Sequence, residues 1–216
     1  MLTYSENSEN HVEGLPGNED EVGNTVADLE ARVAYLERII KVSQVVNSTL
    51  ELGPLLQVIS NVGIELAGSE GCSILLYDSK SKCLRFMPST FSTDEKIVVP
   101  IEGSIAGIIF QKAKPILIRD VQNDPRWNSQ VDQASDFITH SILGVPLKIK
   151  NEVIGVLELV NKVGDKDFGH EDIQIATALA AQAAIAIENA RLLEQVQQAY
   201  DELAELDRLK SEFVSI

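Results

Sequence analysis

Apolar residues in the first part of the chain recur at alternating steps of four and three residues through residues 22–50. This spacing is a heptad repeat. With Val26 at position a, the following a and d positions are occupied by Leu29, Val33, Leu36 and Ile40. β-Branched residues at a with leucine at d favour a parallel pair of helices. The pattern predicts a dimer helix over residues 22–50, although one amphipathic helix packed on its own domain would show the same periodicity.

From residue 51 to residue 169 the apolar residues form short runs separated by polar turns. A helix is predicted over residues 55–67 and a shorter one over 103–111. Strands are predicted over residues 72–77, 83–88, 96–100, 114–119, 142–149 and 153–161. Tight polar turns between successive strands indicate antiparallel hairpins. Helices flanking such a sheet give an α+β fold.

A long helix is predicted from about residue 170 to residue 216. Its first part, residues 173–190, is apolar nearly all round, which is typical of a helix buried between a sheet and another helix. Beyond it a narrow apolar seam follows the heptad spacing, with a phase slip near its end. The seam predicts a second dimer helix over residues 191–216, carried by Leu192, Val196, Leu203 and Leu206.

The charge of the chain limits its partners. It has 33 acidic and 18 basic residues and a formal net charge of -15, whereas nucleic acids and anionic membranes attract clustered Lys and Arg. Residues 1–21 hold six acidic residues and no Lys or Arg, so we expect a disordered acidic tail. There is neither a secretory signal nor an apolar run of the ~20 residues that span a bilayer. We therefore expect a soluble, cytoplasmic protein without nucleic-acid or membrane partners.

The reactive side chains indicate no catalytic chemistry. The two cysteines, Cys72 and Cys83, flank a turn. A turn centred on Lys80 would pair Tyr77 with Cys83 and leave Cys72 several residues away, so no disulfide is expected, and two thiols alone make no metal site. No nucleophile with a base, phosphate-binding glycine loop or carboxylate pair stands out. The chain is not expected to be an enzyme itself.

Three stretches carry a family resemblance: "GSIAGIIFQKAKPILIRDVQNDPRW", "SILGVPLKIKNEVIGVLELVNK" and "DFGHEDIQIATALAAQAAIAIENARLL". Together they resemble a GAF domain, a sensory relative of PAS domains. The resemblance implies a GAF/PAS-like antiparallel sheet of six strands, flanked by helices, with a ligand cavity on the face opposite them. It places a GAF sensory domain at residues 51–190.

Residues 120–141 form the least regular segment and contain the only tryptophan. A loop of about 20 residues in a compact domain is usually functional or mobile. Arg126, Trp127 and Phe137 could close over a small ligand there. An equally weighted alternative is that Trp127 contacts no ligand and serves only to anchor the loop to the core.

The segment "NKVGDKDFGHED" is similar to the signature of GAF domains that bind cyclic nucleotides. Asn161, Lys162, Phe168 and Asp172 match that signature, but Ile173 stands where the signature has glutamate. The resemblance implies a salt bridge between Lys162 and Asp172 that supports the cavity wall. The motif also occurs in GAF domains without a nucleotide ligand, so we favour a structural role and keep a cyclic nucleotide as an alternative.

Other GAF cofactors have weaker support in the sequence. Bilin-binding relatives attach the chromophore to a cysteine, but neither Cys72 nor Cys83 is followed by histidine. Haem-binding relatives use a histidine in the loop before "GVP", and His140 lies close to the predicted strand. We expect neither bilin nor haem, no required cofactor, and a ligand whose identity is unknown.

The last residues, "LDRLKSEFVSI", resemble the start of the dimerisation and phosphotransfer helix of sensor histidine kinases. The resemblance implies that residues 191–216 form a signalling helix leading to a kinase domain. The chain would then be the homodimeric sensory module of a two-component histidine kinase. Two alternatives remain: a constitutive dimerisation spacer with no physiological ligand, and a GAF regulator of a cyclase or phosphatase.

Overall fold

The computed structural model describes residue 33 and residues 51–87, 97–127, 137–164 and 166–214. The chain divides into two compact units, residues 1–38 and residues 39–216, and all of the helices and strands below belong to the second. Val33 is helical and exposed. The acidic tail and the heptad positions Leu29, Leu36 and Ile40 lie outside the described residues. The dimer helix over residues 22–50 therefore stays a prediction.

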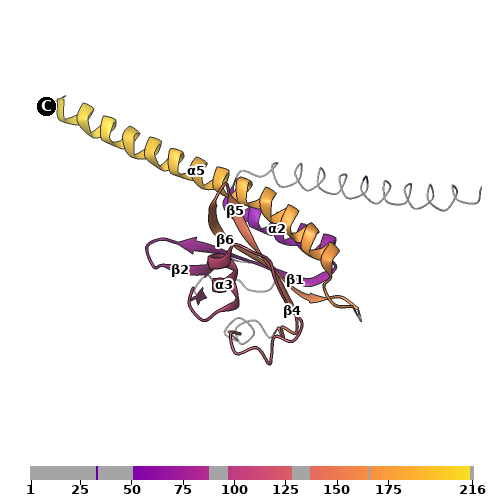
Figure 1. Cartoon of the computed structure of the whole chain (residues 1–216). Coiled ribbons are helices and arrows are strands. Elements are labelled where there is room, and N and C mark those ends of the chain that lie inside the picture. The colour runs from indigo at the N-terminus through magenta and orange to yellow at the C-terminus, as the bar shows by residue number, and fades with distance from the viewer. Residues whose placement is uncertain (1–32, 34–50, 88–96, 128–136, 165, 215–216) are drawn as a thin grey trace, which may run out of the picture. The chain divides into compact units, whose positions relative to one another are not determined.

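Six strands form one antiparallel sheet in the order β3-β2-β1-β6-β5-β4 (Figure 1). Their bounds are β1 Ser69–Asp78, β2 Cys83–Phe86, β3 Val98–Val99, β4 Ile116–Ile118, β5 Ile142–Ile149 and β6 Glu152–Lys162. The two longest strands, β1 and β6, lie side by side in the middle of the sheet. Their middle parts, residues 71–76 of β1 and 155–161 of β6, are buried on both faces. This arrangement confirms the predicted α+β fold with a six-stranded antiparallel sheet.

Helices cover the two faces of the sheet unequally. Helices α2, Leu52–Ala67, and α5, His170–Val214, pack on one face, and the short helix α3, Ile105–Lys112, lies over the other (Figure 1). Successive strand residues point to opposite faces. In β1, Ile74 therefore joins the core under α2 and α5, whereas its neighbour Leu75 joins the core under α3.

Most element boundaries fall within two or three residues of the predicted ones. Strand β5 has the predicted bounds, and β3 and β4 are shorter than predicted. Helix α2 begins three residues earlier, so Gly53 and Pro54 lie in its first turn instead of before it. Proline is tolerated there because the first amides of a helix have no partner within the helix.

The turn between β1 and β2 corrects one predicted register. Asp78, not Tyr77, is opposite Cys83, so the prediction was wrong by one residue. The loop has four residues because Lys82 adopts a left-handed backbone conformation with φ of 54°. Its amide donates to the Asp78 carbonyl at 2.8 Å, which closes the turn.

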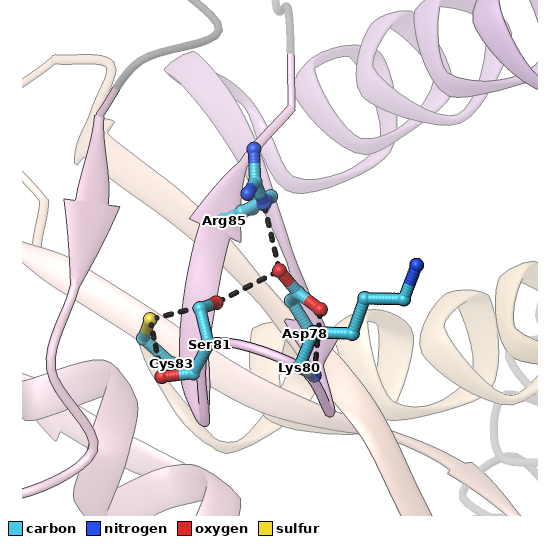
Figure 2. Close-up of polar contacts among 5 residues, drawn as sticks. All are labelled: Asp78, Lys80, Ser81, Cys83 and Arg85. Carbon is cyan, nitrogen blue, oxygen red and sulfur yellow. Dashed lines mark hydrogen bonds and ion pairs between the residues drawn. The ribbon is translucent and has the colours of Figure 1, made fainter.

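The side chain of Asp78 organises this turn (Figure 2). Its carboxylate accepts hydrogen bonds from the Ser81 hydroxyl at 2.8 Å, the Lys80 amide at 2.9 Å and Arg85 Nε at 3.1 Å. These bonds, the Ser81 hydroxyl foremost, lower the pKa of Asp78 to about 2. Cys83 Sγ lies 3.0 Å from the Ser81 hydroxyl. Both cysteines are free, as predicted.

An ion pair joins three elements at one end of the sheet. Lys162, at the end of β6, donates from Nζ to Asp172 Oδ1 and to the carbonyl of Ala67, both at 2.7 Å. The other carboxylate oxygen of Asp172 accepts the Gly169 amide at 2.8 Å, at the start of α5. The two charged side chains are only 19% and 12% exposed, and Phe168 is fully buried with its ring centroid 5.8 Å from Nζ. The predicted pair is confirmed, and it ties together α2, β6 and α5.

Asn161 fixes the segment that enters β5. Its backbone has φ of 55°, a conformation that asparagine tolerates better than most residues. Its Oδ1 accepts the amides of His140 at 2.7 Å and Ser141 at 3.2 Å, while its Nδ2 donates to the Ile138 carbonyl and to Glu70 Oε2, both at 2.8 Å. All hydrogen-bonding capacity of this amide is thus used within the protein.

We predict that Asp172→Ala lowers the free energy of unfolding by about 2 kcal/mol, because it leaves Lys162 without its partner and removes the acceptor for the Gly169 amide. Urea denaturation at pH 7 measures the change. The matched control is Glu171→Ala in the same helical turn, which is exposed and should change stability by less than about 0.5 kcal/mol. Equal unfolding midpoints for the two variants would contradict a structural role for the pair.

Candidate functional site

A cavity lies between the sheet and α3, on the face opposite α2 and α5. Its volume is about 40 Å³, which is room for a few water molecules. Strands β1, β2, β3 and β6 form one wall. The other wall is formed by the start of α3 and by the chain on either side of residues 128–136. The lining residues are Ser73, Leu75, Phe86, Val99, Ser104, Ile105, Ala106, Arg126, Trp127, Phe137, Thr139, Glu158 and Val160.

Small residues beside Glu158 make space for the cavity. Glu158 lies near the middle of β6, opposite Ser73 on β1 and Gly144 on β5. A Cβ atom at Gly144 would be 2.2 Å from Cδ1 of Ile109, so α3 packs directly against the backbone of β5 there. Ile109 therefore occupies the space over Gly144, and on the other side of Glu158 the small side chain of Ser73 lines the cavity together with Glu158.

Glu158 is a buried carboxyl group without a protein partner. It is 8% exposed, and within the described residues no hydrogen bond or ion pair reaches it. Burial raises its pKa from the ordinary 4.5 to about 7. Burying an unpaired carboxyl destabilises a fold, so such groups are found preferentially at functional sites.

Trp127 supplies a second unsatisfied group to the same cavity. Its indole Nε1–H is buried and has no acceptor among the residues that the structure describes. Its backbone is held in a turn, with the Trp127 amide donating to the Asp124 carbonyl at 3.0 Å. Most buried polar groups in native proteins are hydrogen-bonded. A donor and a carboxyl left unsatisfied in one cavity indicate a site that a bound molecule completes.

Arg126 also lines the cavity, but its charge is already balanced. Its Nε donates to Asp124 Oδ1 at 2.8 Å, and its Nη2 donates to Asp124 Oδ2. These hydrogen bonds lower the pKa of Asp124 to about 2, against the opposing effect of burial. The charge of Arg126 is therefore compensated within the protein.

The structure brings together three of the residues predicted from the sequence. Arg126, Trp127 and Phe137 all line the cavity, and Trp127 also packs against the core beneath α3. The four signature residues, Asn161, Lys162, Phe168 and Asp172, are not part of the lining and instead hold the end of β6. Ligand contact by any of the seven stays a prediction.

Sequence reasoning missed Glu158, the main polar group of the site. A signal was present, because Glu158 is the only charged residue between Glu152 and Lys162 in a strand that is otherwise almost entirely apolar. A charge at the centre of a strand buried on both faces needs a reason. Ser73 carried no comparable signal.

Helix α5 continues for many residues past the sheet core. Its last buried residue is Ala190, and every described side chain from residue 192 to residue 210 is exposed. The exposed fractions of Leu192, Val196, Leu203 and Leu206 are 49%, 65%, 64% and 64%. The predicted seam is therefore not covered by the residues that the structure describes. None of the described helices is long and apolar enough to cross a membrane.

We predict that Glu158→Gln stabilises the domain increasingly as the pH rises from 5 to 8. The unfolded chain ionises Glu158 near pH 4.5 and the folded protein near pH 7, so the unfolded state binds fewer protons in between and wild-type stability falls with rising pH. The difference should approach about 3 kcal/mol above pH 7, at about 1.4 kcal/mol per pKa unit. Urea denaturation at several pH values measures it. The control Glu152→Gln, at an exposed position, should show no such trend, and a parallel pH dependence of wild type and Glu158→Gln would contradict the assignment.

Comparison with known proteins agrees with this geometry. The family model described as "GAF domain" matches residues 49–188. The cGMP-specific 3',5'-cyclic phosphodiesterase of Drosophila melanogaster is 30% identical over 127 residues, which are 58% of this chain and 11% of that protein. The chain thus spans about a tenth of the length of the curated relatives that it matches.

Two solved structures show the same fold. The GAF domain of a phosphoenolpyruvate-protein phosphotransferase from Coxiella burnetii superposes with a TM-score of 0.66 at 20% identity, covering 74% of this chain and 96% of that one. Free methionine-R-sulfoxide reductase from Neisseria meningitidis gives a TM-score of 0.60 at 21% identity, covering 74% and 91%. The match over residues 49–188, the six-stranded sheet and the cavity opposite α2 and α5 lead to one conclusion: the chain belongs to the GAF domain family.

Proposed function

We propose that this GAF domain is the sensory module of a two-component histidine kinase, and that it responds to a small molecule bound in the cavity. The observation that carries the proposal is that one cavity is lined both by the buried Glu158 carboxyl, to which no described residue hydrogen-bonds, and by the unsatisfied indole N–H of Trp127. A domain used only as a spacer would gain stability by replacing Glu158 with an apolar residue. A bound ligand that hydrogen-bonds to the Glu158 carboxyl would give this destabilising group a function.

The path from the cavity to the output helix is short. Glu158 and Lys162 lie on the same strand, and Lys162 pairs with Asp172 in the first turn of α5. Helix α5 then runs without interruption for 45 residues, from the sheet into the exposed seam. A displacement of β6 on ligand binding would act directly on the start of a continuous helix.

The exposed seam of α5 supports a homodimer. Leu192, Val196, Leu203 and Leu206 follow heptad spacing and have no partner within the described chain. A second copy in parallel would cover the seam with its own identical residues. The predicted heptad repeat over residues 22–50 would extend the same dimer.

The resemblance of residues 206–216 to the first helix of a kinase dimerisation domain favours a histidine kinase as the output. A ligand that favours one arrangement of the helix pair by a few kcal/mol would switch such an output.

A cyclic nucleotide is the second candidate ligand, with a phosphodiesterase or cyclase-type output. The relatives named as cGMP-specific phosphodiesterases favour it, and the first turn of α3, which lines the cavity, could accept a phosphate at its free amides. Within the described lining, however, the only cationic side chain is Arg126, which is already paired with Asp124.

We predict that Leu203→Glu raises the dimer dissociation constant at least about tenfold, because two carboxylates would then face each other in the apolar seam. Sedimentation equilibrium of the whole chain measures the constant. Gln198→Glu is the matched control, since it introduces the same charge on α5 at an exposed position outside the seam. If the two variants dissociate equally, or if the wild-type chain is monomeric, the seam is not the dimer interface.

We further predict that one residue inserted after Gln197 disrupts ligand control of the kinase, whereas seven inserted residues preserve it. One extra residue rotates the distal helix by about 100°, while seven restore the heptad phase. Autophosphorylation of the protein that joins this module to its kinase domain is the readout, with and without the ligand. Unchanged regulation after the single insertion would exclude α5 as the output path.

A further inference from the structure

We propose that the cavity binds a small organic cation, whose protonated nitrogen donates to the Glu158 carboxylate and which offers a hydrogen-bond acceptor to Trp127 Nε1. The inference rests on the proposed sensory function and specifies the chemical class of its ligand. An ammonium or an amidinium group on a compact molecule would fit this description.

The balance of charges around Glu158 favours a cation. The other charged side chain of the described lining, Arg126, is neutralised by Asp124 through two side-chain hydrogen bonds. Cys72, one residue before Ser73 on β1, is fully buried, and burial raises its pKa to about 12, so it stays a neutral thiol. The remaining polar residues of the lining, Ser73, Ser104 and Thr139, carry no charge. Ionised Glu158 is therefore the only uncompensated charge that the described lining presents, and a monocation would balance it.

The apolar walls provide a second, independent reason. Three aromatic residues, Phe86, Trp127 and Phe137, line the same cavity as the carboxyl group. Aromatic faces attract cations, most strongly where both are removed from water. One carboxylate among several aromatic rings is a suitable environment for an organic cation, whereas a strongly hydrated metal ion would require several oxygen ligands.

The volume and the free indole limit the ligand further. A volume of about 40 Å³ suits a molecule of a few heavy atoms. The Trp127 indole can only donate a hydrogen bond, so the ligand must also carry an acceptor to satisfy it. A planar amidinium would form two parallel hydrogen bonds with the carboxylate, as arginine does.

Ligand binding should release protons. A cation binds the ionised carboxylate, and the pKa of free Glu158 is about 7, so about half a proton should leave per bound cation at pH 7. For the same reason the affinity should increase about tenfold between pH 6 and pH 8. A ligand that only accepts a hydrogen bond from protonated Glu158 would show the opposite trend.

The test uses 2-hydroxyacetamidinium, whose hydroxyl oxygen can accept from Trp127 Nε1, as the cation, 2-hydroxyacetamide as its neutral isostere and cyclic GMP as the alternative ligand, each added to the whole chain. The fluorescence of Trp127, the only tryptophan, reports occupation of the cavity. Titration calorimetry in two buffers with different ionisation enthalpies reports proton release. We expect 2-hydroxyacetamidinium to bind at least about tenfold more tightly than 2-hydroxyacetamide, more tightly at pH 8 than at pH 6, and at least about tenfold more weakly to Glu158→Gln. Glu152→Gln should bind like the wild type, and sodium chloride at equal ionic strength should not change the fluorescence.

Three results would overturn the cation proposal. Equal binding of 2-hydroxyacetamide and 2-hydroxyacetamidinium would show that the charge of the ligand does not contribute to binding. Undiminished binding to a folded Glu158→Gln variant would show that the carboxyl is not the recognition group. Binding of cyclic GMP without binding of the cation would exclude this ligand class while leaving the sensory function intact. The proposed sensory function is tested separately, by the insertion experiment on α5.

Discussion

Burial of the central strand pair, β1 and β6, on both faces is the constraint on which the rest of the structure depends. One face is closed by α2 and α5 through a continuous apolar core. The other is closed only in part by α3 and loop segments. Because strand residues alternate between the two faces, the same strands must carry tightly packed apolar residues toward the helices and a mixture of apolar and polar residues toward the cavity. The domain thus has a closed apolar core on one face of the sheet and a cavity with polar residues in its lining on the other.

Glu158 shows the cost of this separation. Its neighbours on the helix face, Leu157 and Leu159, are fully buried in the core, so β6 has little freedom to turn the carboxyl toward water. The carboxyl must remain in the cavity, where burial raises its pKa to about 7 and ionisation opposes folding. Charge, stability and ligand occupancy are then linked, because any molecule that stabilises the ionised carboxylate also stabilises the folded domain.

The sequence predicted the fold better than the site because the two depend on different kinds of information. Strand β5 and the start of α5 follow from apolar periodicity and are found where predicted. The β1–β2 register depended on one backbone dihedral at Lys82, which no pattern of apolar residues specifies, and it was wrong by one residue. The loop residues Arg126, Trp127 and Phe137 were recognised through their irregular surroundings. The role of Glu158 emerges only when Ser73 and Gly144 are seen beside it in three dimensions.

Two polar residues at the end of β6, Asn161 and Lys162, connect this strand to the segment before β5 and to the start of α5. Asn161 uses both ends of its amide to hold the segment before β5, which carries Thr139 to the cavity, and Lys162 binds Asp172 at the start of α5. Two adjacent residues of β6 therefore contact different parts of the domain: Asn161 the segment that lines the cavity, and Lys162 the start of α5. Since Asp172 also accepts an amide at the first turn of α5, a shift of β6 relative to α5 would break an ion pair that is largely buried. Under the proposed function, a shift of β6 would therefore move α5 as a unit and displace its exposed seam.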